Sequence, residues 1–184
     1  MGSGIPELRV LGTGDGSPRG RQAVPEVAVA YQRALAAHRA GDLATAEKLY
    51  RAILDLHAEH AGAWHFLGVV HLARGDAAAA REMMERSLGL CGTKAVYWNN
   101  YGAVLLKLGR LREAQGAFGR AVGLRDDYAD GWSNLGLVHL EQGELAEAER
   151  CLRRALALQP GHADAWRHRA RLHGVQGAWE EALR

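Results

Sequence analysis

Glycine recurs every 34 residues along most of this chain, and this fixed period constrains the fold more than any other feature of the sequence. The glycines of the series are Gly41, Gly75, Gly109, Gly143 and Gly177. Five residues after each glycine stands an alanine, namely Ala46, Ala80, Ala114, Ala148 and Ala182. Eleven residues before the last four glycines stands a tryptophan, namely Trp64, Trp98, Trp132 and Trp166. Three columns that share one period indicate a stack of similar units rather than a single globular core.

Residues 132–160 show what each unit is expected to form. The first half carries a helical stripe of apolar or small residues at Trp132, Leu135, Gly136 and His139. The second half carries another stripe at Leu145, Ala148, Leu152, Ala155 and Leu156. Gly143 between them supplies the positive φ angle that ends one helix and lets the next turn back. We expect Gly136 and Ala148 to be small because two helices approach closely there, and Trp132 to fill the gap between neighbouring repeats.

Two short antiparallel helices cannot bury both stripes by themselves, so the units must stack. The period and the three columns resemble the tetratricopeptide repeat (TPR) family over about residues 26–184. The resemblance implies an all-α fold, a right-handed solenoid of helical hairpins over residues 25–184. The expected repeats are residues 27–60, 61–94, 95–128 and 129–162, and a truncated fifth, 163–184. In the fifth, half of a second helix is expected after Gly177. Asp42 and Asp76 are placed to cap the second helices of the first two repeats.

Residues 1–24 precede the repeats and contain six glycines. We expect them to form a flexible glycine-rich leader, with Pro25 opening the first helix. The run from Gly12 to Gly16 lacks both the glycine spacing and the Gly-Lys-Ser/Thr ending of nucleotide-binding loops. The apolar stretch from Ile5 to Leu11 could dock on the array, but the sequence does not indicate where.

Composition favours a protein without nucleic-acid or membrane partners. The chain has 23 Lys and Arg against 21 Asp and Glu, a net charge of +2. No apolar run reaches the roughly 18 residues that a transmembrane helix needs, and no secretory signal is apparent. Cys91 and Cys151 belong to non-adjacent repeats, too far apart for a disulfide. Two free thiols favour a reducing compartment, so the predicted location is cytoplasmic.

The sequence predicts neither catalysis nor a cofactor. It has no Gly-x-Ser-x-Gly elbow and no His-Glu-x-x-His motif. Arginines around Cys151 could lower the pKa of its thiol, but a solvated helix face explains them more simply. Of the nine histidines, His57 and His60 belong to the loop between repeats and have no carboxylate or cysteine partner at ligand spacing, so no metal is expected. His71, His139 and His173 share one column with Ala37 and Leu105, which indicates a packing position.

In arrays of this family the first helices line a concave groove, so the resemblance directs attention to the positions that follow each tryptophan. The predicted peptide-binding residues are His65, Asn99, Asn100, Ser133, Asn134, Arg167, His168 and Arg171. Five residues after each tryptophan come Val69, Ala103, Leu137 and Arg171. The groove is therefore expected to be mixed, with amides in its middle and a basic end at Arg167 and Arg171.

Asn100 and Asn134 are the most specific of these residues. An amide offers donors and an acceptor together, which suits an extended peptide backbone. The two asparagines resemble the ladder in the TPR superhelix of O-linked N-acetylglucosamine transferases. The alternative, that they hydrogen-bond adjacent repeats, stays open.

The predicted function is binding: a scaffold that holds another protein or an extended peptide segment in its groove, without chemistry of its own. A rival hypothesis is the N-terminal TPR region of a larger glycosyltransferase- or methyltransferase-like enzyme. A third is anion or nucleic-acid binding through Arg167, His168, Arg169 and Arg171, against which the near-neutral charge argues.

Overall fold

The computed structural model describes residues 20–182, and the side chains of residues 26–177. The described backbone is helical with short turns and contains no strand. Its helices are α1 (Gly20–Arg39), α2 (Leu43–Leu56), α3 (Ala61–Ala73), α4 (Ala77–Leu90), α5 (Ala95–Lys107), α6 (Leu111–Leu124), α7 (Ala129–Glu141), α8 (Leu145–Leu158) and α9 (Ala163–Ala182). None of the helices over residues 20–182 is both long enough and apolar enough to cross a membrane.

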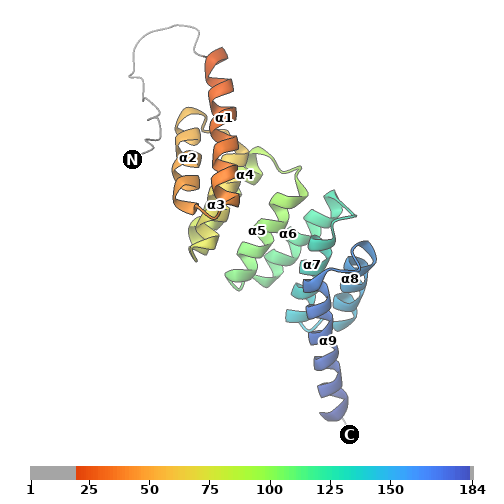
Figure 1. The fold of residues 1–184 in the computed structure, drawn as a ribbon. Coiled ribbons are helices and arrows are strands. Elements are labelled where there is room, and N and C mark those ends of the chain that lie inside the picture. The colour runs from red at the N-terminus through yellow and green to blue at the C-terminus, as the bar shows by residue number, and fades with distance from the viewer. Residues whose placement is uncertain (1–19, 183–184) are drawn as a thin grey trace.

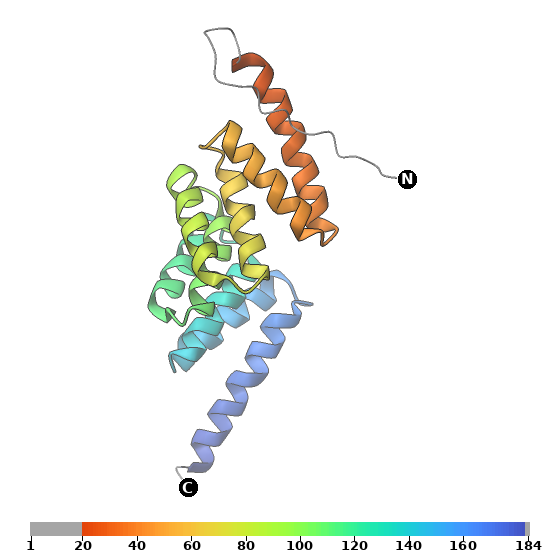
Figure 2. The same ribbon diagram turned by 90° about the vertical axis from the view of Figure 1, so that its left-hand side faces the viewer.

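The helices pair into hairpins α1/α2, α3/α4, α5/α6 and α7/α8, which stack in chain order, and α9 ends the row as a single helix (Figure 1). A view turned by 90° shows α1 and α9 at opposite ends of the stack (Figure 2). The prediction of an all-α solenoid of helical hairpins is thereby confirmed.

Each hairpin turn depends on one glycine of the 34-residue series. Gly41, Gly75, Gly109 and Gly143 have φ angles of 78°, 86°, 73° and 78°, in the left-handed region that only glycine adopts freely. The next residue closes the turn by donating its N–H to a carbonyl five residues back, as Glu144 does to His139 at 2.9 Å. Asp42 and Asp76 cap α2 and α4 as predicted, because each accepts a backbone N–H at 3.0 Å.

Two boundaries differ from the predictions. First, α1 begins at Gly20, five residues before Pro25, so only residues 1–19 of the predicted leader precede it, and these lie outside the described residues. Second, α9 continues through Gly177 to Ala182 instead of turning. Gly177 does not adopt the positive φ angle of the four glycines that form the hairpin turns.

The two helices of a hairpin are in close contact, as predicted. A Cβ atom placed on Gly136 would lie 2.8 Å from Leu152 Cγ, and one on Gly102 would lie 2.7 Å from the Phe118 ring. Ala148 is fully buried on the facing helix. The interior is filled by the second-helix column Tyr50, Met84, Phe118 and Leu152, all with no exposed surface.

The tryptophans fill the space between repeats only in part. Trp132 packs against two hydrophobic clusters, one on each side of it along the stack, yet its side chain is only half-buried. Its indole N–H donates to the Asp126 carbonyl at 2.8 Å, six residues earlier. The same bond recurs from Trp64 to Ala58, Trp98 to Gly92 and Trp166 to Pro160, at 2.7–2.8 Å. The tryptophan column therefore also fixes the loop between repeats, a role that the size of the residue alone did not predict.

Candidate functional site

The candidate site is the face formed by the first helices of the repeats, α1, α3, α5, α7 and α9. The eight predicted peptide-binding residues all lie on these helices, but their exposure differs. His65, Asn99, Ser133 and His168 are buried, and Asn100 and Asn134 are half-buried. Arg167 and Arg171 are exposed.

Six of these residues pair with one another across neighbouring first helices. Asn100 donates through Nδ2 to His65 Nε2 at 3.0 Å, and joins α5 to α3. Asn134 Nδ2 donates to Asn99 Oδ1 at 3.0 Å and joins α7 to α5. Ser133 Oγ lies 3.4 Å from His168 Nδ1, between α7 and α9. Each pair, hereafter a rung, joins residues 35 positions apart, so the contacts follow the stacking of the repeats.

The first rung is aromatic rather than polar. Tyr31 of α1 and Phe66 of α3 are also 35 positions apart, and their ring centroids lie 6.3 Å from each other at an interplanar angle of 58°. Tyr31 was missed as a rung residue because Ala30 stands where the later repeats have the tryptophan that marks the column. The face therefore changes from aromatic at α1 and α3 to amide and imidazole groups further along.

Burial keeps the histidines of the rungs neutral at neutral pH. The His65 ring stacks on Tyr97 with centroids 3.9 Å apart, and burial lowers its pKa to about 4. Because Nε2 accepts from Asn100, the proton lies on Nδ1, which has no partner among the described residues. Burial also lowers the pKa of His168, with a smaller effect of the same sign from Arg167. These rings thus act as neutral hydrogen-bonding groups.

The arginines near the end of the array are paired with carboxylates. Arg171 Nη1 lies 2.6 Å from Glu141 at the end of α7, and this contact lowers the pKa of the Glu141 carboxyl. Arg167 bonds to Asp164 on its own helix at 2.6 Å. At the end of the array that was predicted to be basic, both arginines are thus paired with carboxylates.

Arg169 points elsewhere, to α8. It contacts Glu149 at 2.9 Å and lies over the Trp166 ring at 5.8 Å. Since residues two apart on a helix face different directions, Arg169 does not share a side with Arg167 and Arg171. His168 is buried in its rung. The four residues considered for nucleic-acid binding do not form one cationic patch.

An apolar stripe runs beside the rungs. It consists of Leu35, Val69, Ala103 and Leu137, one half-buried residue on each of α1, α3, α5 and α7. All four stand four residues after a rung residue, and side chains four apart share a side of a helix. The fifth member of the column is Arg171, where the stripe ends at the ion pair with Glu141. A surface with an apolar strip and hydrogen-bonding groups along one edge suits a peptide segment.

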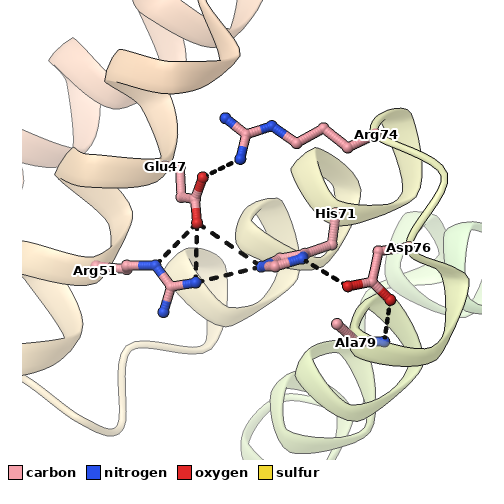
Figure 3. Close-up of polar contacts among 6 residues, drawn as sticks. All are labelled: Glu47, Arg51, His71, Arg74, Asp76 and Ala79. Carbon is pink, nitrogen blue, oxygen red and sulfur yellow. Dashed lines mark hydrogen bonds and ion pairs between the residues drawn. The ribbon is translucent and has the colours of Figure 1, made fainter.

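A separate polar network joins α2, α3 and α4 (Figure 3). Glu47 of α2 accepts from Arg51 Nε at 3.0 Å and Nη2 at 2.9 Å, and it also pairs with Arg74 just past the end of α3. His71 Nε2 lies 4.0 Å from the same carboxylate, and its Nδ1 lies 3.6 Å from the helix-capping Asp76. The network fixes neighbouring repeats to each other.

The histidine column was predicted to be a packing position, but two of its histidines also contact a carboxylate at the start of the following helix. His139 repeats the arrangement, with Nδ1 at 2.5 Å from Glu144, five residues later. The column lies at the end of the first helix, where a ring can reach the residue that begins the second. The sequence signal for this contact is an acidic residue five positions after the histidine, namely Asp76 after His71 and Glu144 after His139.

The described residues offer little for chemistry. No group of three or more His, Cys, Asp or Glu side chains between residues 26 and 177 is placed to hold a metal ion. The Cys151 thiol is fully buried, and burial raises its pKa to about 11 despite the neighbouring Arg150. Arg150 does lower this pKa, but desolvation of the buried thiolate outweighs its attraction.

Comparison with known proteins agrees with the repeat geometry. Two family models described as tetratricopeptide repeat match residues 31–95 and 129–162. A search of curated protein sequences finds no significant match.

Solved structures with the same arrangement of helices include MamA, 22% identical with a TM-score of 0.72, covering 85% of this chain and 86% of MamA. Another is YrrB, described as a TPR protein with an unusual peptide-binding site, at 24% identity and a TM-score of 0.71 over 90% of this chain and 88% of YrrB. A third is the Thermobaculum terrenum O-GlcNAc transferase, at 22% identity and a TM-score of 0.71 over 77% of this chain but 27% of the transferase. At these identities the likeness concerns the fold.

Proposed function

Because this chain belongs to the tetratricopeptide repeat family, we propose that it is a binding scaffold whose first-helix face holds a peptide or an extended segment of another protein. The observation that carries the proposal is the apolar stripe of Leu35, Val69, Ala103 and Leu137 with the rungs along its edge. YrrB, a structural relative with a peptide-binding site, supports this use of the fold.

The rungs leave defined groups for a ligand. Asn100 and Asn134 each use Nδ2 within a rung, so their Oδ1 atoms are the acceptors that a peptide N–H would meet. Such bonds contribute about 0.5–1.5 kcal/mol each. Arg167 and Arg171 would bind an acidic end of the ligand only by breaking their ion pairs with Asp164 and Glu141. This cost reduces the binding free energy that the new contacts provide. Apolar side chains of the ligand that pack on the stripe would contribute the larger part of the binding free energy.

The test uses a matched pair of charged substitutions. Ala103→Glu places a carboxylate on the stripe, and Ala78→Glu places one on the exposed side of α4, away from the first helices. Glutamate is a good helix former, but Ala103 also packs against the apolar cluster of α5–α8, so circular dichroism first establishes that each variant is folded. A partner would be captured from a lysate with the parent array and its affinity measured by calorimetry for all three proteins. We expect Ala103→Glu to weaken binding at least tenfold and Ala78→Glu to leave it unchanged; the reverse order would place the site elsewhere.

The likeness to a glycosyltransferase supports a second candidate, the TPR region of a larger enzyme. In that case the same face would present a substrate protein to a catalytic domain outside this sequence. The length of the native reading frame distinguishes the two candidates, because a scaffold needs no such domain.

A further inference from the structure

Among the described residues, no helix covers the face of α1 that corresponds to the covered face of every other first helix. In α3 this face consists of Ala63, Leu67 and Val70, which pack in one cluster with α2 and are 0–1% exposed. The fully buried Val104 and Val138 stand in the Val70 column of α5 and α7, and Leu172 stands there in α9. A first helix thus normally hides this face against the preceding repeat.

The corresponding residues of α1, 34 positions earlier, are Val29, Arg33 and Ala36. All three are exposed, and Val29 is 55% exposed. Together with Ala28 and Gln32 they line a shallow depression that is almost wholly apolar. We call Val29, Arg33 and Ala36 the end face of α1, the helix at one end of the stack (Figure 2).

Residues 5–11, Ile-Pro-Glu-Leu-Arg-Val-Leu, have the composition that this face requires. Ile5, Leu8 and Leu11 recur at three-residue intervals, which places them on one side of a helical turn. Pro6 near the start and Gly12 just after Leu11 are typical of the two ends of a short helix. Glu7 is the one acidic residue in residues 1–14, and it is opposite in charge to Arg33.

The chain between this stretch and α1 is long enough. The middle of the end face, at Arg33, lies 13 residues into α1, or ~20 Å along the helix axis at a rise of 1.5 Å per residue. Residues 12–19 span up to ~26 Å when extended. A second copy of the chain is a poorer occupant, because a symmetric pair formed through this face would bring two copies of Arg33 together.

We propose that residues 5–11 dock on the end face of α1 and take the place of a preceding second helix, with residues 12–19 as the connection. Ile5, Leu8 and Leu11 then cover Val29 and Ala36, and Glu7 lies beside Arg33. This capping is independent of what the first-helix face binds.

A spin label on the docked segment tests the proposal directly. Arg9→Cys carries the label in a Cys91→Ser background, where the remaining Cys151 is buried. We expect selective broadening of the backbone amide resonances around Arg33 in ¹⁵N-labelled full-length protein, and its loss when Leu8→Asp is added. Uniformly sharp α1 resonances would overturn the proposal. Equal broadening in a mixture of spin-labelled and separately ¹⁵N-labelled molecules would also overturn it, because the occupant would then be a second copy.

Hydrogen exchange provides a second measurement. Val29→Asp and Leu8→Asp should each speed exchange of the α1 amides several-fold, and the two together should do no more than either alone. Val96→Asp is the matched control, since Val96 is an exposed valine on α5 with 40% exposure. It should leave α1 exchange unchanged. Additive effects of Val29→Asp and Leu8→Asp, or no effect of Leu8→Asp, would show that the two residues do not meet.

Discussion

Acidification should weaken the array through the buried imidazole of His65. The ring is 1% exposed, stacks on Tyr97 and accepts a hydrogen bond from Asn100 through Nε2. Burial lowers its pKa from the ordinary 6.5 to about 4 in the folded protein. Protonation would require a second N–H at Nε2, where the Asn100 amide already donates, so the charged ring loses its rung as well as its solvation.

The size of the effect follows from linkage. Between pH 6.5 and pH 4 the unfolded chain binds more protons at this site than the folded one, so the stabilisation is complete above pH 6.5 and is lost as pH falls toward 4. From about pH 7.5 to about pH 5 the loss from His65 alone is about 2 kcal/mol. His38, His60 and His168 also have pKa values lowered mainly by burial, and they steepen the total dependence in the same direction.

His65→Gln isolates the contribution of one ring. Glutamine keeps an acceptor for Asn100 but does not titrate. Any loss of unfolding free energy that the glutamine side chain itself causes is therefore the same at every pH. Urea unfolding of the parent and the variant, followed by circular dichroism across this pH range, measures both stabilities. The parent should lose about 2 kcal/mol more than His65→Gln between pH 7.5 and pH 5. Parallel pH profiles would refute the assignment of a buried neutral imidazole.

Three further predictions concern packing and reactivity. Gly102→Ala should destabilise by about 1–3 kcal/mol in urea unfolding because its Cβ meets the Phe118 ring, whereas Gly116→Ala, which faces open space, should be neutral or stabilising. Trp98→Phe removes the indole bond to the loop while keeping an aromatic ring, and should lower the free energy of unfolding by about 0.5–1.5 kcal/mol; an unchanged value would mean that this bond contributes nothing. Cys91 should react with a maleimide in the native protein, while Cys151 should react only after unfolding, as peptide mapping would show.

The sequence predicted the hairpins because their determinants are local and periodic. Gly143 ends a helix through its own backbone, and the Asp76 carboxylate caps one by accepting the backbone N–H of Ala79, three residues later. Gly177 occupies the same position of the 34-residue period as Gly143, yet it lies within a helix, and Arg169 and Ala170 stand where the Gly143 repeat has Leu135 and Gly136. A glycine at the right period therefore predicts a hairpin turn only where the preceding helix also carries the packing residues of the repeat.

The candidate site was predicted less completely. Its residues were found by their distance in sequence from a tryptophan, but their hydrogen-bond partners lie on other repeats. Which residues pair depends on the axial shift between neighbouring first helices, which the sequence does not give directly. The ion pair of Arg171 with Glu141 joins residues 30 positions apart, so it does not follow the 35-residue spacing of the rungs. Tyr31 was missed because its repeat lacks the marker tryptophan, although position 31 follows from the same period.

The rungs change how residues on this face should be interpreted in such an array. Each rung pairs the residue after tryptophan in one repeat with the second residue after tryptophan in the next, so polar side chains in these two columns first serve the spacing of the first helices. Replacing Asn100 or Asn134 by alanine would remove a ligand acceptor and a bond between repeats at once, and a loss of binding could not be attributed to either. Ala103 stands on the same side of α5 and takes part in no rung. Because Ala103 also packs against the apolar cluster of α5–α8, a substitution there separates recognition from the integrity of the stack when urea unfolding shows unchanged stability.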